Sequence, residues 1–296
     1  LKYVIAFDYK IYYSRWGARL CGNAISRLTD PVMFGWHQVM RSLAHLVLIC
    51  LVLPSVDSTS FGEIRAGAAE RNITPPVGTE IQHYFRTSVG VHEPLFARCL
   101  YLEDSQGSQL AIVSLDLILG GFEACDQLRE TIRKQTGIQN TLLAFSHTHA
   151  SLALGPRGKT KVRTDTGSKW NDKTLDAILG IIQKAKKVAQ PVKLRVGRSA
   201  VQVGFNRRLL NERTGSVYMG PNRQGSVVPW VNVLIADSQK TGKPIAVLFQ
   251  HTAHPVIVPH KSKMISADFP GAAVNRIREN LGSDVIAMFG QGCAGN

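Results

Sequence analysis

Two stretches decide the fold of this chain: LLAFSHTH at residues 142–149 and IAVLFQHTAHP at residues 245–255. Each is an apolar run of strand character that ends in a cluster of histidines. Histidine after the carboxyl end of a buried strand is a common way for an α/β protein to build a metal or acid–base site. Because His147 and His149 are two residues apart, they share one face of an extended segment. One imidazole can then bind a metal while the other stays beside it for a substrate.

The segments around these stretches alternate between strand and helix patterns. Two hairpins are expected, one from residues 97–103 and 109–115 and one from residues 231–237 and 244–250. Further strands are expected at residues 141–146, 192–203 and 284–289, and the continuous apolar run of the first predicts burial on both faces. Helical spacing is seen at residues 125–135, 174–188 and 272–281, and residues 155–168 are typical of a surface loop. The sequence therefore predicts an α/β fold with one or more mixed sheets and helices.

Polar residues follow at least four of the expected strands. Asp116 ends one hairpin, the two histidine clusters end two other strands, and the small residues 290–296 follow the last strand. An open α/β sheet places its ligands where such strand ends converge. We therefore expect the functional site at the carboxyl ends of the strands.

The two histidine clusters together favour a zinc site. Imidazole is a good zinc ligand, and a catalytic zinc needs about three protein ligands gathered from separate segments. Pro255 restricts His254 to an extended backbone, which fixes the direction of its side chain. The alternatives are a hydrogen-bonded histidine pair at 147–149 and a polar loop at 251–255, in which His251 is a structural residue or a neighbour of the site.

Three other segments offer candidate site residues, each with a structural alternative. Asp268 could orient a ligating histidine, or Ser266 or Asp268 could cap the helix that follows. Arg207, next to Arg208, could hold a carboxylate or an oxyanion, or both could belong to a solvated basic turn. The small residues of 290–296 could bring backbone N–H groups to a ligand, or form a plain turn.

Composition and missing motifs exclude several functional classes. An apolar content of 44% is that of a globular protein with a sizeable core, and the net charge is +14. The basic residues are scattered and not interleaved with aromatic residues, which disfavours nucleic-acid binding. The sequence has no Walker loop, no Gly-x-Gly-x-x-Gly motif and no Gly-x-Ser-x-Gly elbow. These absences disfavour phosphate-loop, dinucleotide-binding and simple serine-hydrolase functions.

The amino-terminal residues do not resemble domain structure. Residues 40–58 contain a basic start, a short apolar core and small residues, which is the layout of a secretory signal, although a buried core helix is the alternative. Residues 1–39 then belong to an over-extended upstream segment. A secreted or periplasmic protein is expected on this basis.

Six motifs, taken in order, resemble the neutral/alkaline ceramidases and their bacterial relatives. The resemblance covers the chain from about Ala66 onward. The motifs are Ile73-Thr74-Pro75-Pro76-Val77-Gly78, Ser146-His147-Thr148-His149, Asn206-Arg207, His254-Pro255, Ser266-Ala267-Asp268 and Gln291-Gly292-Cys293-Ala294-Gly295-Asn296.

The resemblance implies a zinc amidase that cleaves the N-acyl bond of ceramide into sphingosine and a fatty acid. His147 and His254 match the first two zinc ligands, His149 matches a substrate-side histidine, and Arg207 matches the active-site arginine. Asn296 stands where the family has Asp. A Glu and a Tyr that also bind zinc in the family would lie beyond residue 296, so residues 59–296 are expected to be the amino-terminal part of the catalytic domain.

Three functions remain open at this point. The first is a secreted zinc amide hydrolase of ceramidase type that acts on a lipid amide and meets anionic membrane surfaces through its basic residues. The second is a non-catalytic binding or remnant protein of the same fold. The third is a metallohydrolase for another amide or an ester.

Overall fold

A computed structural model describes residues 62–81, 86–156, 165–259 and 261–294. The predicted upstream segment at 1–39 and the predicted signal at 40–58 lie outside the described residues. The domain described below is therefore the part of the chain to which the motif resemblance applies.

Eight strands form one mixed sheet in the order β16-β14-β13-β10-β1-β5-β6-β8. The pairs β6–β8 and β14–β16 are parallel, and the other neighbours are antiparallel. The two expected hairpins are confirmed as β5–β6 and β13–β14. The strand bounds are Ile64–Asn72 for β1, Phe96–Glu103 for β5, Gln109–Leu115 for β6, Asn140–Phe145 for β8, Gln190–Ala200 for β10, Trp230–Ser238 for β13, Pro244–His251 for β14 and Ile286–Gln291 for β16.

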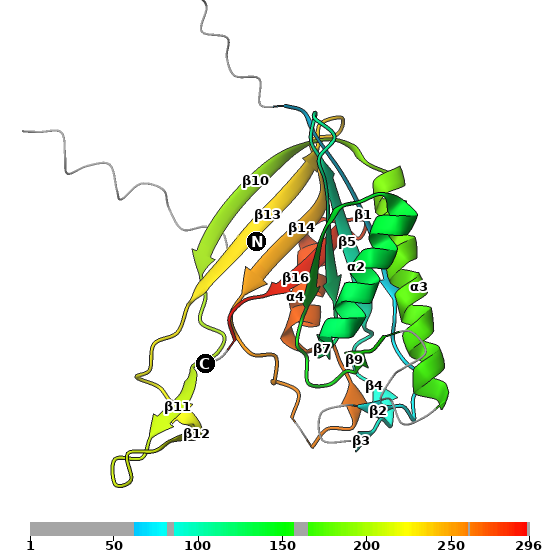
Figure 1. Cartoon of the computed structure of the whole chain (residues 1–296). Coiled ribbons are helices and arrows are strands. Elements are labelled where there is room, and N and C mark those ends of the chain that lie inside the picture. Colours follow the sequence, from blue (N-terminus) through cyan, green and yellow to red (C-terminus); the bar gives the residue numbers. More distant parts are fainter. Residues whose placement is uncertain (1–61, 82–85, 157–164, 260, 295–296) are drawn as a thin grey trace, which may run out of the picture. The chain divides into compact units, whose positions relative to one another are not determined.

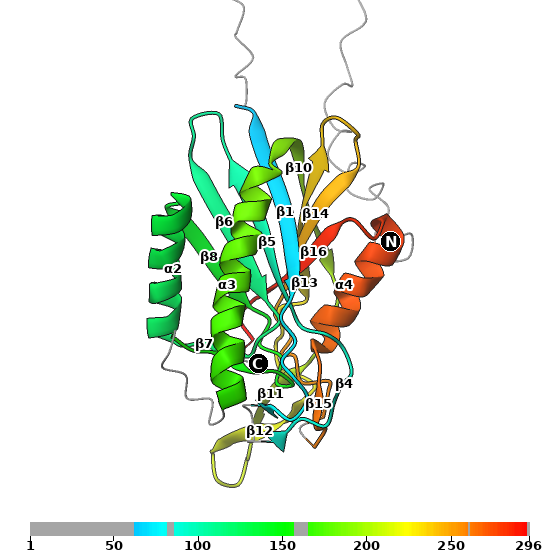
Figure 2. The same cartoon turned by 90° about the vertical axis from the view of Figure 1, so that its right-hand side faces the viewer.

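In the described part of the chain, three helices cover the outer face of the sheet (Figures 1 and 2). Helices α2 (Phe122–Thr136) and α3 (Asp165–Lys187) pack over β8, β1 and β5, and α4 (Asp268–Leu281) packs on β16. Helix α2 ends at Gly137, whose φ of 75° is a left-handed conformation that glycine adopts without strain. Among the helices of the described part of the chain, none combines the length and apolar composition needed to cross a bilayer.

The sheet curls until its two ends touch. Strand β16 contacts β5, β6 and β8, although among the strands of the sheet order it pairs with β14, at the other end. An apolar cluster with members from both halves fills the curl, including Leu100, Ile112, Ala236 and Met288. The Ser114 hydroxyl donates a hydrogen bond of 2.7 Å to the Phe289 carbonyl across the contact. The ends of the two parallel pairs are therefore held close together.

Short strand pairs surround these ends and stand apart from the main sheet. The pairs are β2 (Glu80–Ile81) with β3 (Arg86–Thr87), β4 (Gly90–Val91) with β15 (Met264–Ile265), β7 (Leu119–Gly120) with β9 (Ala153–Leu154), and β11 (Asn206–Leu210) with β12 (Val217–Asn222). The loop segments that carry the histidines run among these pairs.

The burial of β8 and the start of α3 differ from the sequence-based expectations. Strand β8 is not buried on both faces: Leu143 and Phe145 pack against the core under the helices, whereas Leu142 is 53% exposed. The strand is apolar from Leu142 to Phe145 but lies at the end of the sheet order, where its second face is only partly covered. Residues 165–168 of the surface loop expected at 155–168 belong instead to α3, which begins at Asp165, and residues 157–164 lie outside the described residues.

The close approach of α3 to β1 requires glycine at residue 67. A Cβ there would overlap the Ala185 carbonyl oxygen of α3, a backbone atom that cannot turn aside. We expect Gly67→Ala to lower the free energy of unfolding by about 1–3 kcal/mol, which is the usual cost of overpacking. Urea unfolding followed by circular dichroism measures this change in the free energy of unfolding.

The matched control is Gly180→Ala in α3, where a Cβ meets no atom within 4 Å. Alanine in a helix interior should stabilise by about 0.5–1 kcal/mol. Equal effects of the two substitutions would contradict the close-packing explanation.

Candidate metal centre

Three histidines from two loops converge at the carboxyl ends of the strands. His147 and His149 follow β8, and His254 follows β14. The Nε2 atom of His149 lies 3.4 Å from Nε2 of His147 and 2.9 Å from Nε2 of His254. One ligand atom from each of the three side chains lies within 4.8 Å of the others. The structure therefore joins the two clusters that the sequence placed 100 residues apart.

Backbone carbonyls set the direction of two of these rings. Nδ1 of His147 is 2.7 Å from the Ile118 carbonyl oxygen, and Nδ1 of His254 is 3.0 Å from the Ala294 carbonyl oxygen. A carbonyl oxygen only accepts hydrogen bonds, so each Nδ1 carries a proton, and in the neutral ring Nε2 then keeps its lone pair. This is the arrangement that orients metal-binding histidines in proteins.

The loop of His147 and His149 is fixed by contacts with the rest of the site. The Thr148 hydroxyl, which is fully buried, donates to the Ser266 carbonyl at 2.8 Å. The His149 carbonyl accepts a hydrogen bond from Arg86 Nη2 at 3.2 Å. The backbone N–H of His149 donates to the Pro255 carbonyl at 3.4 Å. The two histidine loops are therefore bonded to each other, to Arg86 and to the segment before α4.

The distances fit a metal bound through imidazole nitrogen. A tetrahedral zinc with Zn–N bonds of about 2.0–2.1 Å separates its ligand nitrogens by about 3.3 Å. The His147–His149 separation of 3.4 Å matches this value, and the His149–His254 separation of 2.9 Å is shorter. The Nε2 atom of His149 lies close to those of His147 and His254, the two residues predicted as ligands. The geometry therefore allows all three side chains to bind one ion. The division of roles between His149 and the other two stays a prediction.

Ser266 and Asp268 both accept N–H groups at the start of α4, as one of the two expectations had it. The N-cap position is Ala267, whose side chain makes no capping bond, and the Ser266 hydroxyl oxygen accepts the Asp268 N–H at 3.0 Å. Asp268 has a φ of 56°, and its carboxylate accepts the N–H groups of Phe269 at 2.7 Å and Val258 at 2.8 Å. The Asp268 side chain thus ties the loop that follows His254 to the start of α4. Its effect on His254 is through the backbone.

Two other candidates are buried near the strand ends. Asp116, 1% exposed, accepts hydrogen bonds from the Phe96 N–H at 2.9 Å and from Arg98 at 2.8 Å. His251, 4% exposed, has its Nδ1 atom 3.1 Å from the Trp230 carbonyl oxygen, and its own carbonyl accepts the Gly292 N–H. His251 is not part of the metal-binding group found among the described residues.

The remaining candidates lie on β11 and at the end of the chain. Arg207 is half-buried on β11, at the irregularity in its pairing with β12, and Arg208 beside it is exposed. Asn296 lies outside the described residues. The catalytic role of Arg207 stays a prediction.

In its described residues 292–294, the segment after β16 contacts the site through a backbone carbonyl, and not through free N–H groups as one expectation had it. The Gly292 N–H is used by the His251 carbonyl, and the Ala294 carbonyl holds His254. Sequence reasoning missed the carbonyls of Ile118 and Ala294 as well as Arg86, because a backbone carbonyl carries no residue signature. The nearest signal was the Gly-rich turn itself.

The buried cysteines are unsuited to the chemistry of the site. Cys99 and Cys125 are buried free thiols, and Cys293 is an exposed one. Burial raises the pKa of the Cys99 thiol to about 12 and also raises that of Cys125. Since the thiolate is the ligand and nucleophile, neither buried cysteine is available at neutral pH.

Comparisons with known proteins bear on the fold. No family model matches the sequence, and no curated protein matches it. The neutral ceramidase structure from Pseudomonas aeruginosa matches with a TM-score of 0.64 and 19% identity, over 79% of this chain and 39% of that chain. A ceramidase structure complexed with C2 matches with a TM-score of 0.62 and 19% identity, over 78% and 38%. The chain thus spans about two fifths of the length of these structures.

The expected resemblance to neutral ceramidases is therefore confirmed as a resemblance of fold. The part of the chain that aligns with the ceramidases is a mixed α/β domain with one large mixed sheet, as predicted.

Loss of one imidazole should strongly weaken metal binding. We expect His147→Ala and His254→Ala each to raise the zinc dissociation constant by more than the roughly 10–100-fold that outer partners of a metal site contribute. Competition with a chelator measures the dissociation constant, and mass-spectrometric metal analysis measures the zinc content. The matched control is His92→Ala, which removes an exposed histidine that is outside the group. Stoichiometric zinc in the His147→Ala/His254→Ala double variant would contradict the assignment.

Proposed function

We propose that this protein is a zinc-dependent hydrolase of a lipid amide of ceramide type, with His147 and His254 holding the metal. The observation that carries the proposal is the convergence of three imidazole Nε2 atoms within a fold shared with neutral ceramidases. The motif order Ser146–His149, His254-Pro255 and Ser266–Asp268 supports it, because all three segments meet at this centre.

The residues of the centre have distinct tasks in this mechanism. A bound zinc would polarise the amide carbonyl and lower the pKa of a bound water toward about 7. His147 and His254 hold it through Nε2 while their Nδ1–H groups stay on the Ile118 and Ala294 carbonyls. His149 accepts and returns a proton at Nε2 on the substrate side. Arg207 steadies the oxyanion or the product carboxylate.

The proposed place of action is outside the cytoplasm. The support is the basic, apolar and small-residue pattern of residues 40–58, which is that of a secretory signal. Amino-terminal sequencing of the exported protein tests this: a mature chain that begins near residue 59 supports export, and an intact leader contradicts cleavage.

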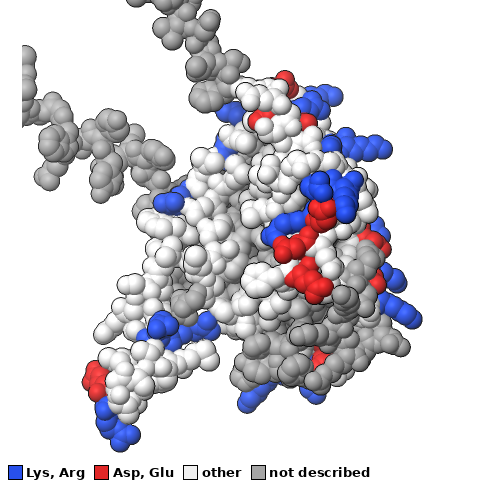
Figure 3. All heavy atoms as spheres, viewed as in Figure 1, with Lys and Arg blue, Asp and Glu red and all other residues white. Residues whose placement is uncertain are grey.

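A membrane surface is the proposed place where the enzyme meets its substrate. The β11–β12 hairpin exposes a series of apolar side chains: Leu210 (54%), Val217 (52%), Tyr218 (51%) and Met219 (79%). Residues 206–223 also carry four arginines and one acidic residue, Glu212. Figure 3 shows basic side chains on the hairpin, which projects from the main sheet in Figure 1. Apolar and cationic side chains together are what an anionic lipid interface attracts.

Hydrolysis of a short-chain fluorescent N-acylsphingosine tests the proposed reaction. We expect release of the fatty acid by the zinc-loaded protein, abolished by a chelator and restored by zinc. His149→Ala should lower kcat by about 10²–10⁴-fold, since it removes the proton-transfer group and leaves the two predicted ligands in place. His92→Ala is the matched control and should leave kcat unchanged.

The alternative functions give different results in the same assay. Binding of the ceramide without turnover would favour a non-catalytic protein of this fold. Turnover of a simple ester or another amide, but not of the ceramide, would favour a different metallohydrolase. Hydrolysis that survives both the chelator and the double substitution of His147 and His254 would contradict metal dependence.

Vesicle co-sedimentation tests the membrane contact. We expect binding to vesicles that contain phosphatidylserine, and a loss of about tenfold or more in the Tyr218→Ser/Met219→Ser variant, because each buried CH₂ contributes about 0.8 kcal/mol. The control is Phe122→Ser at the start of α2, an apolar side chain that is 92% exposed. Equal losses in both variants, or equal binding to neutral vesicles, would contradict a hairpin-directed contact.

A further inference from the structure

His147 is held in an unusual conformation by two consecutive carbonyls. Its φ is 65°, in the left-handed region that residues other than glycine rarely adopt. Its backbone N–H donates to the Leu117 carbonyl at 3.0 Å, and its Nδ1 lies 2.7 Å from the Ile118 carbonyl oxygen. Residues 117–118 therefore set both the backbone and the ring of His147. The position of these two residues decides where the Nε2 lone pair points.

Asp116, directly before these two residues, is anchored to the neighbouring strand β5. Its Oδ2 atom accepts the Phe96 N–H at 2.9 Å and Arg98 Nη1 at 2.8 Å. Its own N–H donates to the Phe96 carbonyl at 3.0 Å. The exit of the chain from β6 is thus held by three bonds, one of them a buried ion pair.

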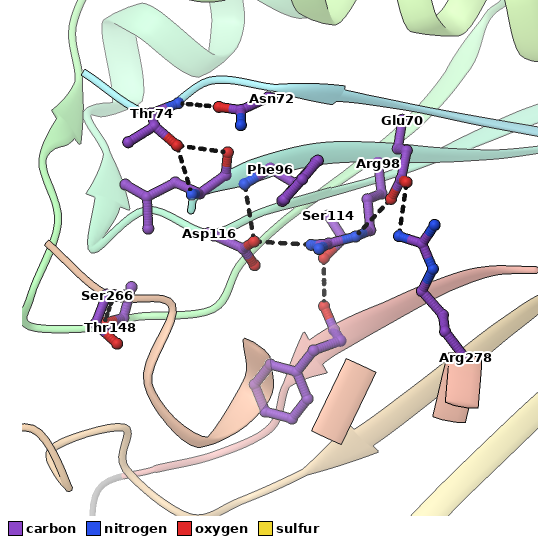
Figure 4. A network of polar contacts seen from close by, with 12 residues as sticks. Glu70, Asn72, Thr74, Phe96, Arg98, Ser114, Asp116, Thr148, Ser266 and Arg278 are labelled. Atoms are coloured by element: carbon purple, nitrogen blue, oxygen red, sulfur yellow. Dashed lines mark hydrogen bonds and ion pairs between the residues drawn. The ribbon is translucent and has the colours of Figure 1, made fainter. Parts of the chain in front are cut away.

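The ion pair continues as a chain of alternating charge to the surface of α4 (Figure 4). Arg98 Nε is 3.3 Å from Glu70 Oε2, and Glu70 Oε1 is 2.8 Å from Arg278 Nη1. Side-chain exposure falls from 28% at Arg278 through 17% at Glu70 and 3% at Arg98 to 1% at Asp116. Removing one charge of an ion pair leaves the other without a partner. The loss of stability is larger when that remaining charge is buried, because water cannot solvate it.

We propose that the charge chain Arg278–Glu70–Arg98–Asp116, which is buried at its Asp116 end, positions His147 for the metal by fixing residues 117–118. Asp116 and Arg98 act as positioning residues: they hold the two carbonyls that impose the Nδ1–H tautomer and the left-handed backbone on His147. The role in metal binding rests on the function proposed above, whereas the orientation of the ring does not require it. The charge chain therefore connects α4, β1, β5 and the end of β6 to one imidazole.

Nitrogen-15 NMR of the metal-free protein reads the tautomer of His147 directly. In its neutral state the wild-type ring should be in the Nδ1–H form, because Nδ1 lies 2.7 Å from the Ile118 carbonyl oxygen. Asp116→Asn keeps the shape of the side chain and removes its charge. We expect a mixture of tautomers in this variant and a zinc dissociation constant raised about 10–100-fold, which is the usual effect of an outer partner of a metal site.

A core variant separates positioning from general destabilisation. Ile182→Ala removes a fully buried side chain in α3, on a helix that carries no part of the charge chain or the histidine group. It should lower Tm but leave the His147 tautomer and the zinc affinity unchanged. If Ile182→Ala changes the tautomer or the affinity as much as Asp116→Asn does, the proposal is overturned.

Variants nearer the surface keep the test valid if Asp116→Asn does not fold. Glu70→Gln and Arg278→Met interrupt the same chain at 17% and 28% exposure, and should shift the tautomer in the same direction by decreasing amounts. An unchanged Nδ1–H form in Glu70→Gln and in Asp116→Asn would overturn the proposal. A wild-type protein that shows the predicted tautomer but binds no zinc would refute the proposed function while supporting the positioning role.

Discussion

The contact between the two ends of one curled sheet is the constraint on which the candidate site depends. In a flat sheet, six inter-strand steps of about 4.8 Å would separate β8 from β14, and the loops after them would lie about 29 Å apart. The curl brings β16 against β5, β6 and β8, and the Ser114–Phe289 hydrogen bond joins the two halves. Because both parallel pairs end at this contact, His147 and His254 follow their strands into the same place.

The requirement that buried polar groups find partners then shapes the centre. The carbonyls of Ile118 and Ala294 need donors, and the imidazole Nδ1 atoms supply them. The same bonds leave the Nε2 atoms facing one another. A left-handed backbone at His147 is tolerated here because neighbouring bonds hold it. The orientation of the rings is therefore a by-product of satisfying the backbone at the strand ends.

Much of the local structure followed from sequence patterns. Both hairpins were predicted because their turns are short and polar, and the helix predicted at 125–135 lies within α2. The start of α4 was predicted four residues late, since Pro270 obscured a helix that begins at Asp268. Proline is tolerated in a first turn because the N–H it lacks would have no partner within the helix. The partial exposure of β8 was missed because an apolar run does not reveal what covers each face.

The sequence by itself determined the apolar runs, their ends, and the histidines placed after two of them. It also indicated which segments belong to one site, through the order of motifs such as Ser146–His149 and Ser266–Asp268. The tertiary structure alone decided that His149 lies as close to the centre as His147, which carbonyls turn the rings, and which charges support them. The physical reason is that strand and helix periods are local, whereas the curl and the buried pairs join residues far apart in the chain.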